Sequence, residues 1–271
     1  MKLTRRTTFS SGHRYWRNDL SPEENKALFG KWASPYNHGH NYVLDVSFSG
    51  RIDPANGMVI NIKTLDRKIR ENVIGILDQK SLSDEVDFFI TNPSSTENVV
   101  RFVEEKLGKM PAGVALSGIR VYETPLLFAE KGEGGEVNLT RVYEFSASHR
   151  LNIPGMSHEE NVELFGKCNN PAGHGHNYVL EVTVSGVPSK ETGMITDIET
   201  MDEAVRREVV DRYDHKHLNE DIPEFRGTNP TTEVLTKTIW ERLSGALPAK
   251  LKRVVVRETA RNFFEYNGED E

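Results

Sequence analysis

Three stretches in the second half of the chain have the pattern of β-strands. Residues 137–151 alternate polar and apolar side chains, with Tyr143 and Phe145 on one face, and this period of two predicts a strand. Residues 176–186 and 250–259 are rich in β-branched residues, which favour strands. A short hairpin is expected directly after the second of these strands.

Two further stretches have the period of an α-helix. Residues 197–213 place four apolar side chains on one helical face, namely Ile198, Met201, Val205 and Val209. Residues 228–245 contain the second predicted helix. Thr231 or Thr232 can cap its start, and Gly245 sits just past its end. The predicted fold class is therefore α+β, an antiparallel sheet with two helices packed on one face.

The same series of motifs occurs twice along the chain. "FSSGHR" returns as "FSASHR", "HGHNYVLDVSFSG" as "HGHNYVLEVTVSG", and "NGMVINI" as "TGMITDI". From His13 to His149 the spacing is 136 residues, which is the length of a domain rather than of a solenoid repeat. The Gly- and Glu-rich stretch 129–138 is expected to be a linker between two domains, residues 1–130 and residues 138–271.

Composition narrows the function classes. The net charge of −7 argues against a general nucleic-acid-binding protein, which would present a basic face. The single cysteine excludes a disulfide within the chain and fits a reducing compartment. The apolar stretches are too short for a membrane span, and the basic N-terminus lacks the apolar run of a secretory signal. These features predict a cytoplasmic protein that does not bind membranes.

A group of histidines predicts a metal site in the second copy. His174 and His176 are two apart on a predicted strand, so their side chains leave the same face, and His149 ends the preceding strand. Three histidines without a fourth protein ligand are typical of an open zinc site, where water or substrate completes the coordination. One such pair alone is more often a hydrogen-bonded polar patch. The whole trio recurs in the first copy, however, as His13, His38 and His40.

Candidate catalytic residues surround the second trio. Cys168 can act as a base or nucleophile if a cation or metal lowers the pKa of its thiol. The adjacent Asp214 and His215 can orient an imidazole for proton transfer, and Glu258 ends the last predicted strand. Taken singly, each has an ordinary structural explanation: a small core residue, a helix-capping pair and a solvated carboxylate.

The combined motifs resemble the 6-pyruvoyl-tetrahydropterin synthase family. "FSASHRL", "EENVELFGKCNNPAGHGHNY", "TGMITDI", "YDHKHLN", "NPTTE" and "VVVRET" carry the resemblance over residues 138–266, and the first copy carries it over about residues 3–130. The resemblance implies a tunnelling fold (T-fold) in each domain, a catalytic Zn²⁺ and active sites at subunit interfaces. It implies conversion of 7,8-dihydroneopterin triphosphate to 6-pyruvoyl-tetrahydropterin with loss of triphosphate, a carbon–oxygen lyase reaction.

The resemblance also implies a role for each matching residue. The zinc ligands would be His149, His174 and His176. Cys168 would be the general base that takes a proton from a side-chain carbon, with Asp214 and His215 as the proton-relay pair. Glu258 would anchor the pterin ring through paired hydrogen bonds, and Thr231 and Thr232 would line the same pocket.

The first copy departs from this pattern at two positions. Trp32 replaces the cysteine, and Gln79 replaces the histidine that follows Asp78. Neither side chain can exchange a proton near neutral pH. The histidine trio and Glu123 are kept, so this copy is expected to hold a metal without running the chemistry, and pterin binding by it stays open. Its expected role is that of a scaffold in the oligomer.

The resemblance implies a homo-oligomer, in which three tandem chains would form a pseudo-hexamer. If like copies form a ring with one another, each active site takes all its catalytic residues from second copies. If unlike copies alternate instead, Cys168 can face Gln79 and the enzyme would be dead.

Two other functions remain open on sequence grounds. One is a 6-carboxy-tetrahydropterin synthase of queuosine biosynthesis, although the five residues between Cys168 and His174 favour the pyruvoyl enzymes. The other is a zinc- or pterin-binding protein without turnover. Arg150, Lys167 and Lys216 lie beside site residues and can meet a triphosphate.

Overall fold

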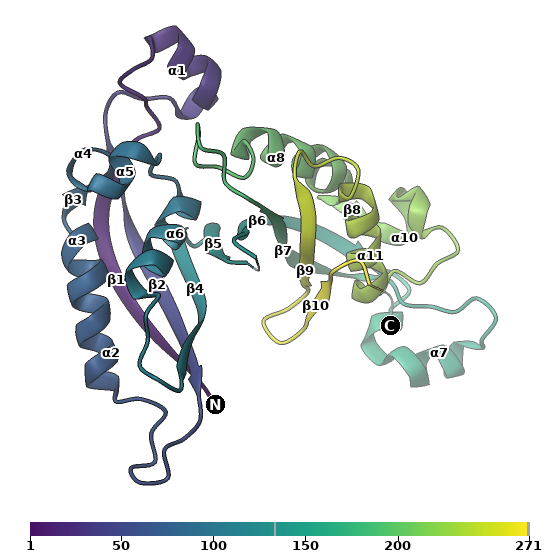
Figure 1. The fold of residues 1–271 in the computed structure, drawn as a ribbon. Helices are drawn as coiled ribbons and strands as arrows, with labels where there is room; N and C mark the ends of the chain where they lie inside the picture. Colours follow the sequence, from purple (N-terminus) through teal and green to yellow (C-terminus); the bar gives the residue numbers. More distant parts are fainter. Residues whose placement is uncertain (133, 270–271) are drawn as a thin grey trace. The chain divides into compact units, whose positions relative to one another are not determined.

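The computed structural model describes residues 1–132 and 134–269 (Figure 1). Packing divides the chain into two units: Met1–Thr140 with Ser185–Asp197, and Arg141–Val184 with Ile198–Glu271. The segment Ser185–Asp197 belongs to the second copy in sequence, yet it packs with the first unit. Glu133, in the predicted linker, and Asp270 and Glu271, at the end of the second predicted domain, lie outside the described residues.

The first unit is built on a sheet with strand order β5-β4-β2-β1-β3, which is antiparallel except that the short β3 runs parallel to β1. Its two long strands, β1 and β2, pair from Lys2 opposite Ser49 to His13 opposite His38, so the end of β1 meets the start of β2. The strands are β1 (Lys2–His13), β2 (His38–Gly50), β3 (Lys80–Ser81), β4 (Val114–Thr124) and β5 (Leu127–Lys131).

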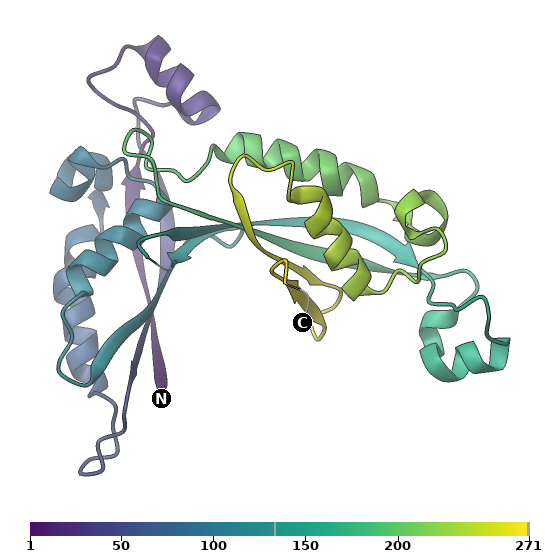
Figure 2. The same cartoon turned by 45° about the vertical axis from the view of Figure 1, so that its right-hand side comes forward.

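Helices cover one face of this sheet, as Figures 1 and 2 show for α2 and α6. The side chain of Ser21 caps α1 in a capping box with Glu24, and Ser95 caps α6. The helices are α1 (Pro22–Phe29), α2 (Ile62–Ile69), which continues through a π-helical turn (Arg70–Ile74) into α3 (Gly75–Leu77), α4 (Leu82–Glu85), α5 (Asp87–Thr91) and α6 (Thr96–Leu107); a 3₁₀ turn (Gly30–Trp32) follows α1.

The second unit repeats the arrangement, with strand order β10-β9-β7-β6 and β8 paired to β6. Its strands are β6 (Val137–His149), β7 (His174–Gly186), β8 (Lys216–His217), β9 (Lys250–Arg257) and β10 (Phe263–Tyr266). Its helices are α7 (His158–Phe165), α8 (Ile198–Val205), a π-helical turn (Arg206–Val210), α9 (Asp211–Tyr213), α10 (Leu218–Asp221) and α11 (Thr232–Leu243), with 3₁₀ turns at Gly166–Asn169 and Pro223–Phe225.

The α+β prediction is confirmed, and Thr231 rather than Thr232 is the residue that caps α11. Two details of the sequence interpretation are wrong. The linker is shorter than 129–138, because β5 runs to Lys131 on buried apolar residues and β6 begins at Val137. The last predicted strand ends at Arg257, and β10 folds back antiparallel on β9.

Candidate metal centre and active site

Each unit gathers its three histidines at the junction of two long strands. His149 ends β6, and His174 and His176 begin β7; the possible ligand atoms of the trio all lie within 4.8 Å of one another. The Nε2 atoms of His149 and His174 are 3.2 Å apart. The first trio has the same geometry at the ends of β1 and β2 and consists of His13, His38 and His40.

The hydrogen bonds of these rings suit metal ligation. Nδ1 of His149 donates to the carbonyl of Pro230 at 2.8 Å, and Nδ1 of His13 donates to that of Ser94 at 2.7 Å. A carbonyl only accepts, so Nδ1 carries the proton and Nε2 keeps its lone pair toward the trio. Among the described residues, no hydrogen-bond partner meets the buried Nε2 of His13, His40 or His176.

Burial also lowers the pKa and so favours the neutral, ligating form of four imidazoles, those of His13, His38, His149 and His174. Desolvation lowers the pKa of His149, and it lowers the pKa of His13 to about 4. Converging Nε2 atoms, three of which have no hydrogen-bond partner among the described residues, fit a metal ion with an open coordination position. Both trios therefore pass this test as sites that can hold a metal.

Glu258 lies just beyond β9 and faces the second trio. Its Oε1 is 3.7 Å from Nε2 of His149 and also 3.7 Å from Nε2 of His176. The hydroxyl of Thr232 donates to the same oxygen at 2.8 Å, while Thr231 is occupied in capping α11. The structure thus brings Glu258 and Thr232 to the metal centre.

Cys168 sits in the 3₁₀ turn that follows α7 and is half-buried. Its carbonyl accepts a hydrogen bond from the Leu151 N–H at 2.8 Å, which ties the turn to the chain just after His149. Burial raises the pKa of the thiol, and the Glu258 carboxylate raises it further. The thiol of the free chain is therefore protonated at neutral pH.

Asp214 and His215 lie in the turn between α9 and β8, beside β6, and form a hydrogen-bonded pair. Asp214 accepts hydrogen bonds from the Ser146 N–H and from His215 Nδ1, each at 2.7 Å. Both bonds lower the pKa of Asp214, and the bond from Ser146 has the larger effect. His215 has a φ of 58°, in the left-handed region that non-glycine residues rarely adopt. Its side chain is 84% exposed and lines a pocket that includes His176 but not Cys168.

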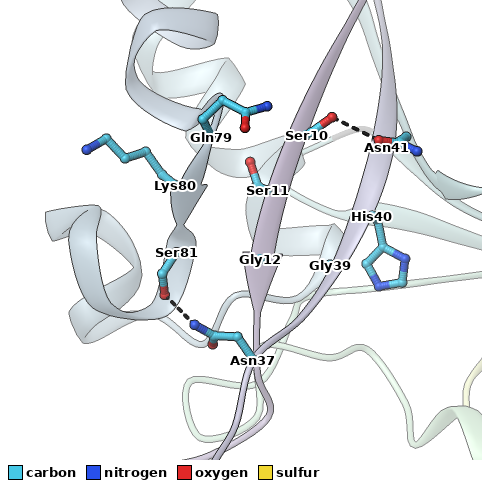
Figure 3. Close-up of a pocket in the computed structure, with 10 residues that line it drawn as sticks. All are labelled: Ser10, Ser11, Gly12, Asn37, Gly39, His40, Asn41, Gln79, Lys80 and Ser81. Atoms are coloured by element: carbon cyan, nitrogen blue, oxygen red, sulfur yellow. Dashed lines mark hydrogen bonds between the residues drawn. The ribbon is translucent and has the colours of Figure 1, made fainter.

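The first copy keeps the backbone of this pair without the imidazole. Gln79 has a φ of 59°, its N–H donates to Ser10 O at 2.7 Å, and Asp78 accepts from the Ser10 N–H at 2.8 Å. Figure 3 shows Gln79 beside β1, next to Ser10 and Ser11, in a pocket that His40 also lines. The strained conformation is retained although the side chain that would use it is gone.

Trp32 stands where the second copy has Cys168, and it is packed into an apolar cluster. The cluster consists of Tyr15, Phe29 and Met194, with Trp32 against it. Glu123 is buried and accepts a hydrogen bond from the Thr96 hydroxyl, as Glu258 does from Thr232. The first copy therefore preserves the metal trio and the carboxylate but fills the thiol position with an indole.

Sequence reasoning missed two groups near these sites. Tyr178 follows His176 on the same strand face, its ring centroid lies 5.6 Å from that of His176, and its buried hydroxyl has no partner among the described residues. The period of two would have indicated this position. Glu97, at the start of α6, is fully buried, whereas an acidic residue in a first helical turn is usually exposed.

Glu97 gives a pH prediction. Burial, with a smaller contribution from the nearby Glu123, raises its pKa to about 7, although the Ile195 N–H donates to its Oε1 at 3.0 Å. The unfolded chain releases this proton near the ordinary value of 4.5, so stability falls as pH rises from there to about 7 and then stays level. Glu97→Gln should raise the midpoint of thermal unfolding at pH 8 by a few degrees.

The difference should vanish near pH 4, where both states hold the proton. Glu105→Gln, at an exposed position on the same helix, is the matched control and should change nothing. An equal gain for Glu97→Gln at both pH values would mean that its carboxyl group does not titrate in this range.

Comparison with known protein families assigns both halves of the chain. A family model described as 6-pyruvoyl tetrahydropterin synthase matches residues 2–133 and again residues 138–269. The chain belongs to the 6-pyruvoyl tetrahydropterin synthase family. This membership confirms the predicted resemblance and tandem duplication, and it makes the protein an enzyme of the lyase-type pterin synthases.

Named relatives of this synthase family match one copy each. A 6-pyruvoyl tetrahydrobiopterin synthase of Drosophila melanogaster is 46% identical over 132 residues, which are 48% of this chain and 79% of the relative. The Homo sapiens protein of the same name is 42% identical over 142 residues, 51% of this chain and 98% of the relative. A Caenorhabditis elegans 6-pyruvoyl tetrahydropterin synthase structure has a TM-score of 0.48 at 38% identity and covers 49% of this chain and 96% of its own.

No helix in the described part of this synthase-family chain has the length and apolarity needed to cross a membrane.

Proposed function

We propose that the second copy is a zinc-dependent 6-pyruvoyl-tetrahydropterin synthase. It would convert 7,8-dihydroneopterin triphosphate to 6-pyruvoyl-tetrahydropterin and triphosphate. The observation that carries this proposal is the contrast between the copies: both keep the histidine trio and the facing carboxylate, but only the second has Cys168 and His215. At Gln79 the first copy keeps the backbone conformation of His215 but not its imidazole.

In this proposal, Zn²⁺ is held by His149, His174 and His176. Bound there, the metal would acidify the protons beside the substrate's side-chain hydroxyls and stabilise negative charge on oxygen. The Nδ1 hydrogen bond of His149 to Pro230 fixes the ring that presents Nε2. A metal in the first copy would be held by the matching trio and would have no thiol beside it.

Glu258 is proposed to bind the pterin ring. An ionised carboxylate can accept two parallel hydrogen bonds from the amino and ring N–H donors at the edge of a pterin. The Thr232 hydroxyl donates a hydrogen bond to Oε1 of this carboxylate and so holds its orientation. Thr231 would support the pocket through the helix cap.

Cys168 is proposed to take the carbon-bound proton, with Asp214 and His215 moving protons in turn. Since burial and Glu258 raise the pKa of the thiol, forming the thiolate requires a cation nearby, such as the metal or a protonated histidine. Asp214 can hold the Nδ1 proton of His215 and leave Nε2 free to exchange one. The pocket that His215 lines does not include Cys168. We therefore propose that the relay pair that serves a given Cys168 comes from another chain of the oligomer.

We propose a cytoplasmic homo-oligomer of three chains that form a pseudo-hexamer. The single cysteine and the family's interfacial sites support this assignment. The first copy would hold a metal and fill its place in the oligomer.

The test is conversion of 7,8-dihydroneopterin triphosphate by the zinc-loaded full chain, with both products identified by mass. The proposal predicts tripolyphosphate and 6-pyruvoyl-tetrahydropterin. A carboxy product with acetaldehyde would instead make the chain a 6-carboxy-tetrahydropterin synthase. Zinc binding without any release of tripolyphosphate would make it a binding protein.

A further inference from the structure

The first unit contains a docked hairpin that comes from the second copy. Within Ser185–Asp197, the Gly193 carbonyl accepts from the Ser95 hydroxyl at 2.5 Å, and the Ile195 N–H donates to Glu97 at 3.0 Å. Between these two bonds, Met194 is only 5% exposed. It packs into the cluster that Trp32 adjoins.

The shape of this hairpin is specific to its seat. Gly193 has a φ of 74°, and a Cβ at this position would lie 2.6 Å from Asn98 Nδ2 and 2.9 Å from both Pro93 O and Ser95 Oγ. A glycine is therefore required on two grounds, because of the left-handed backbone and because of the close approach of α6.

The second copy has the matching seat, and in the described chain the seat lies open. Glu233 and Thr231 stand at the positions of Glu97 and Ser95, yet Glu233 is exposed where Glu97 is 1% exposed. On α7, which leads to Cys168, Leu164 is 56% exposed. Its counterpart in the first copy, Leu28, is partly buried against the cluster.

The first copy has the matching hairpin, which lies free of any such seat. "NGMVIN" at 56–61 corresponds to "TGMITD" at 192–197. Gly57 has a φ of 72°, close to the 74° of Gly193, so the two turns share this left-handed glycine. Met58 is 40% exposed and Ile62 is 47% exposed, although both are large apolar residues.

We propose that a second copy of this chain seats its residues 51–61 on the second-copy site and so completes the Cys168 pocket. By the geometry of the docked hairpin, the Val59 N–H donates to Glu233, the Gly57 carbonyl accepts from Thr231, and Met58 packs beside α7. Each proposed active site is then shared between the catalytic copy of one chain and the non-catalytic copy of another. The contact therefore joins a first copy of one chain to a second copy of another, as in the arrangement in which unlike copies alternate. Residues 51–61 make this contact, and Gln79 does not.

A cross-link tests this contact without reference to catalysis. Because Cys168 is the only native thiol, Met58→Cys creates one new partner for a short bis-maleimide. The expected result is covalent species of two or more chains on a denaturing gel. The Met58→Cys, Cys168→Ala double variant should give far less, and so should Arg51→Cys, because the counterpart of Arg51, Val187, stays 70% exposed in the docked hairpin.

A link within one chain, or equal linking by Arg51→Cys and Met58→Cys, would overturn the proposal.

A measurement of turnover gives a second, independent test, which rests on the proposed function. Met58→Asp changes an exposed residue, so the chain should fold, yet turnover should fall at least tenfold. Mixing it with the Cys168→Ala chain should restore turnover, because an intact hairpin then reaches an intact Cys168. If the chain cross-links as expected but converts no substrate, the proposed contact is supported and only the proposed function is wrong.

Discussion

Replacing Cys168 with alanine is expected to abolish turnover while the zinc content stays unchanged. A positioned general base contributes about 10²–10⁴-fold to a rate, and the second copy offers no other thiol at this position. The half-buried side chain is small, so its loss should leave the fold intact. The measurement is kcat with 7,8-dihydroneopterin triphosphate, together with the metal content of the same preparation.

Cys168→Ser is the matched variant. A hydroxyl keeps the size and the hydrogen bonding of the thiol but gives up a proton far less readily, so its activity should lie close to that of the alanine variant. Loss of metal in either variant would make Cys168 a zinc ligand. Full activity in Cys168→Ala would remove it from the chemistry.

The second large effect is expected from Glu258→Gln. The neutral amide still accepts from Thr232, but it can no longer accept two charge-assisted hydrogen bonds from the edge of a pterin. Each such bond to a charged group is worth about 1.5–3 kcal/mol, so kcat/KM should fall about 100-fold or more. The check is a KM-against-kcat comparison, with the loss expected mainly in KM.

Glu123→Gln is the internal control for this prediction. It makes the same change in the copy where Trp32 stands in place of the thiol, and kcat/KM should be unaffected. An equal loss in both variants would mean that the first copy also takes part in the reaction. A loss of metal from Glu258→Gln would mean that Glu258 serves the histidines rather than the substrate, since its Oε1 lies 3.7 Å from two of them.

Local periodicity was enough to predict the elements that carry the site. The alternation in residues 137–151 predicted β6, and the two-residue spacing of His174 and His176 placed both rings on one face of β7. Local chemistry also narrowed the helix cap to Thr231 or Thr232, and Thr231 is the residue that caps α11. These features depend on neighbouring residues only, so one sequence contains them.

Features that depend on distant contacts could not be predicted in the same way. The burial of Glu97 depends on Ile195, which is far away in sequence, and no local pattern links the two. The motif order alone suggested one cluster around the second trio, whereas the pocket that His215 lines includes His176 but not Cys168. The strand β10 is only four residues long, too short for its alternation to stand out.

The comparison of two histidine variants tests most directly the claim that the chemistry belongs to the second copy. His174→Ala and His38→Ala each remove one ligand from one of the two trios, so each should lower the bound zinc from about two ions per chain to about one. His174→Ala should abolish triphosphate release, and His38→Ala should retain it. Release that survives His174→Ala but is lost in His38→Ala would contradict the assignment and place the active metal in the first copy.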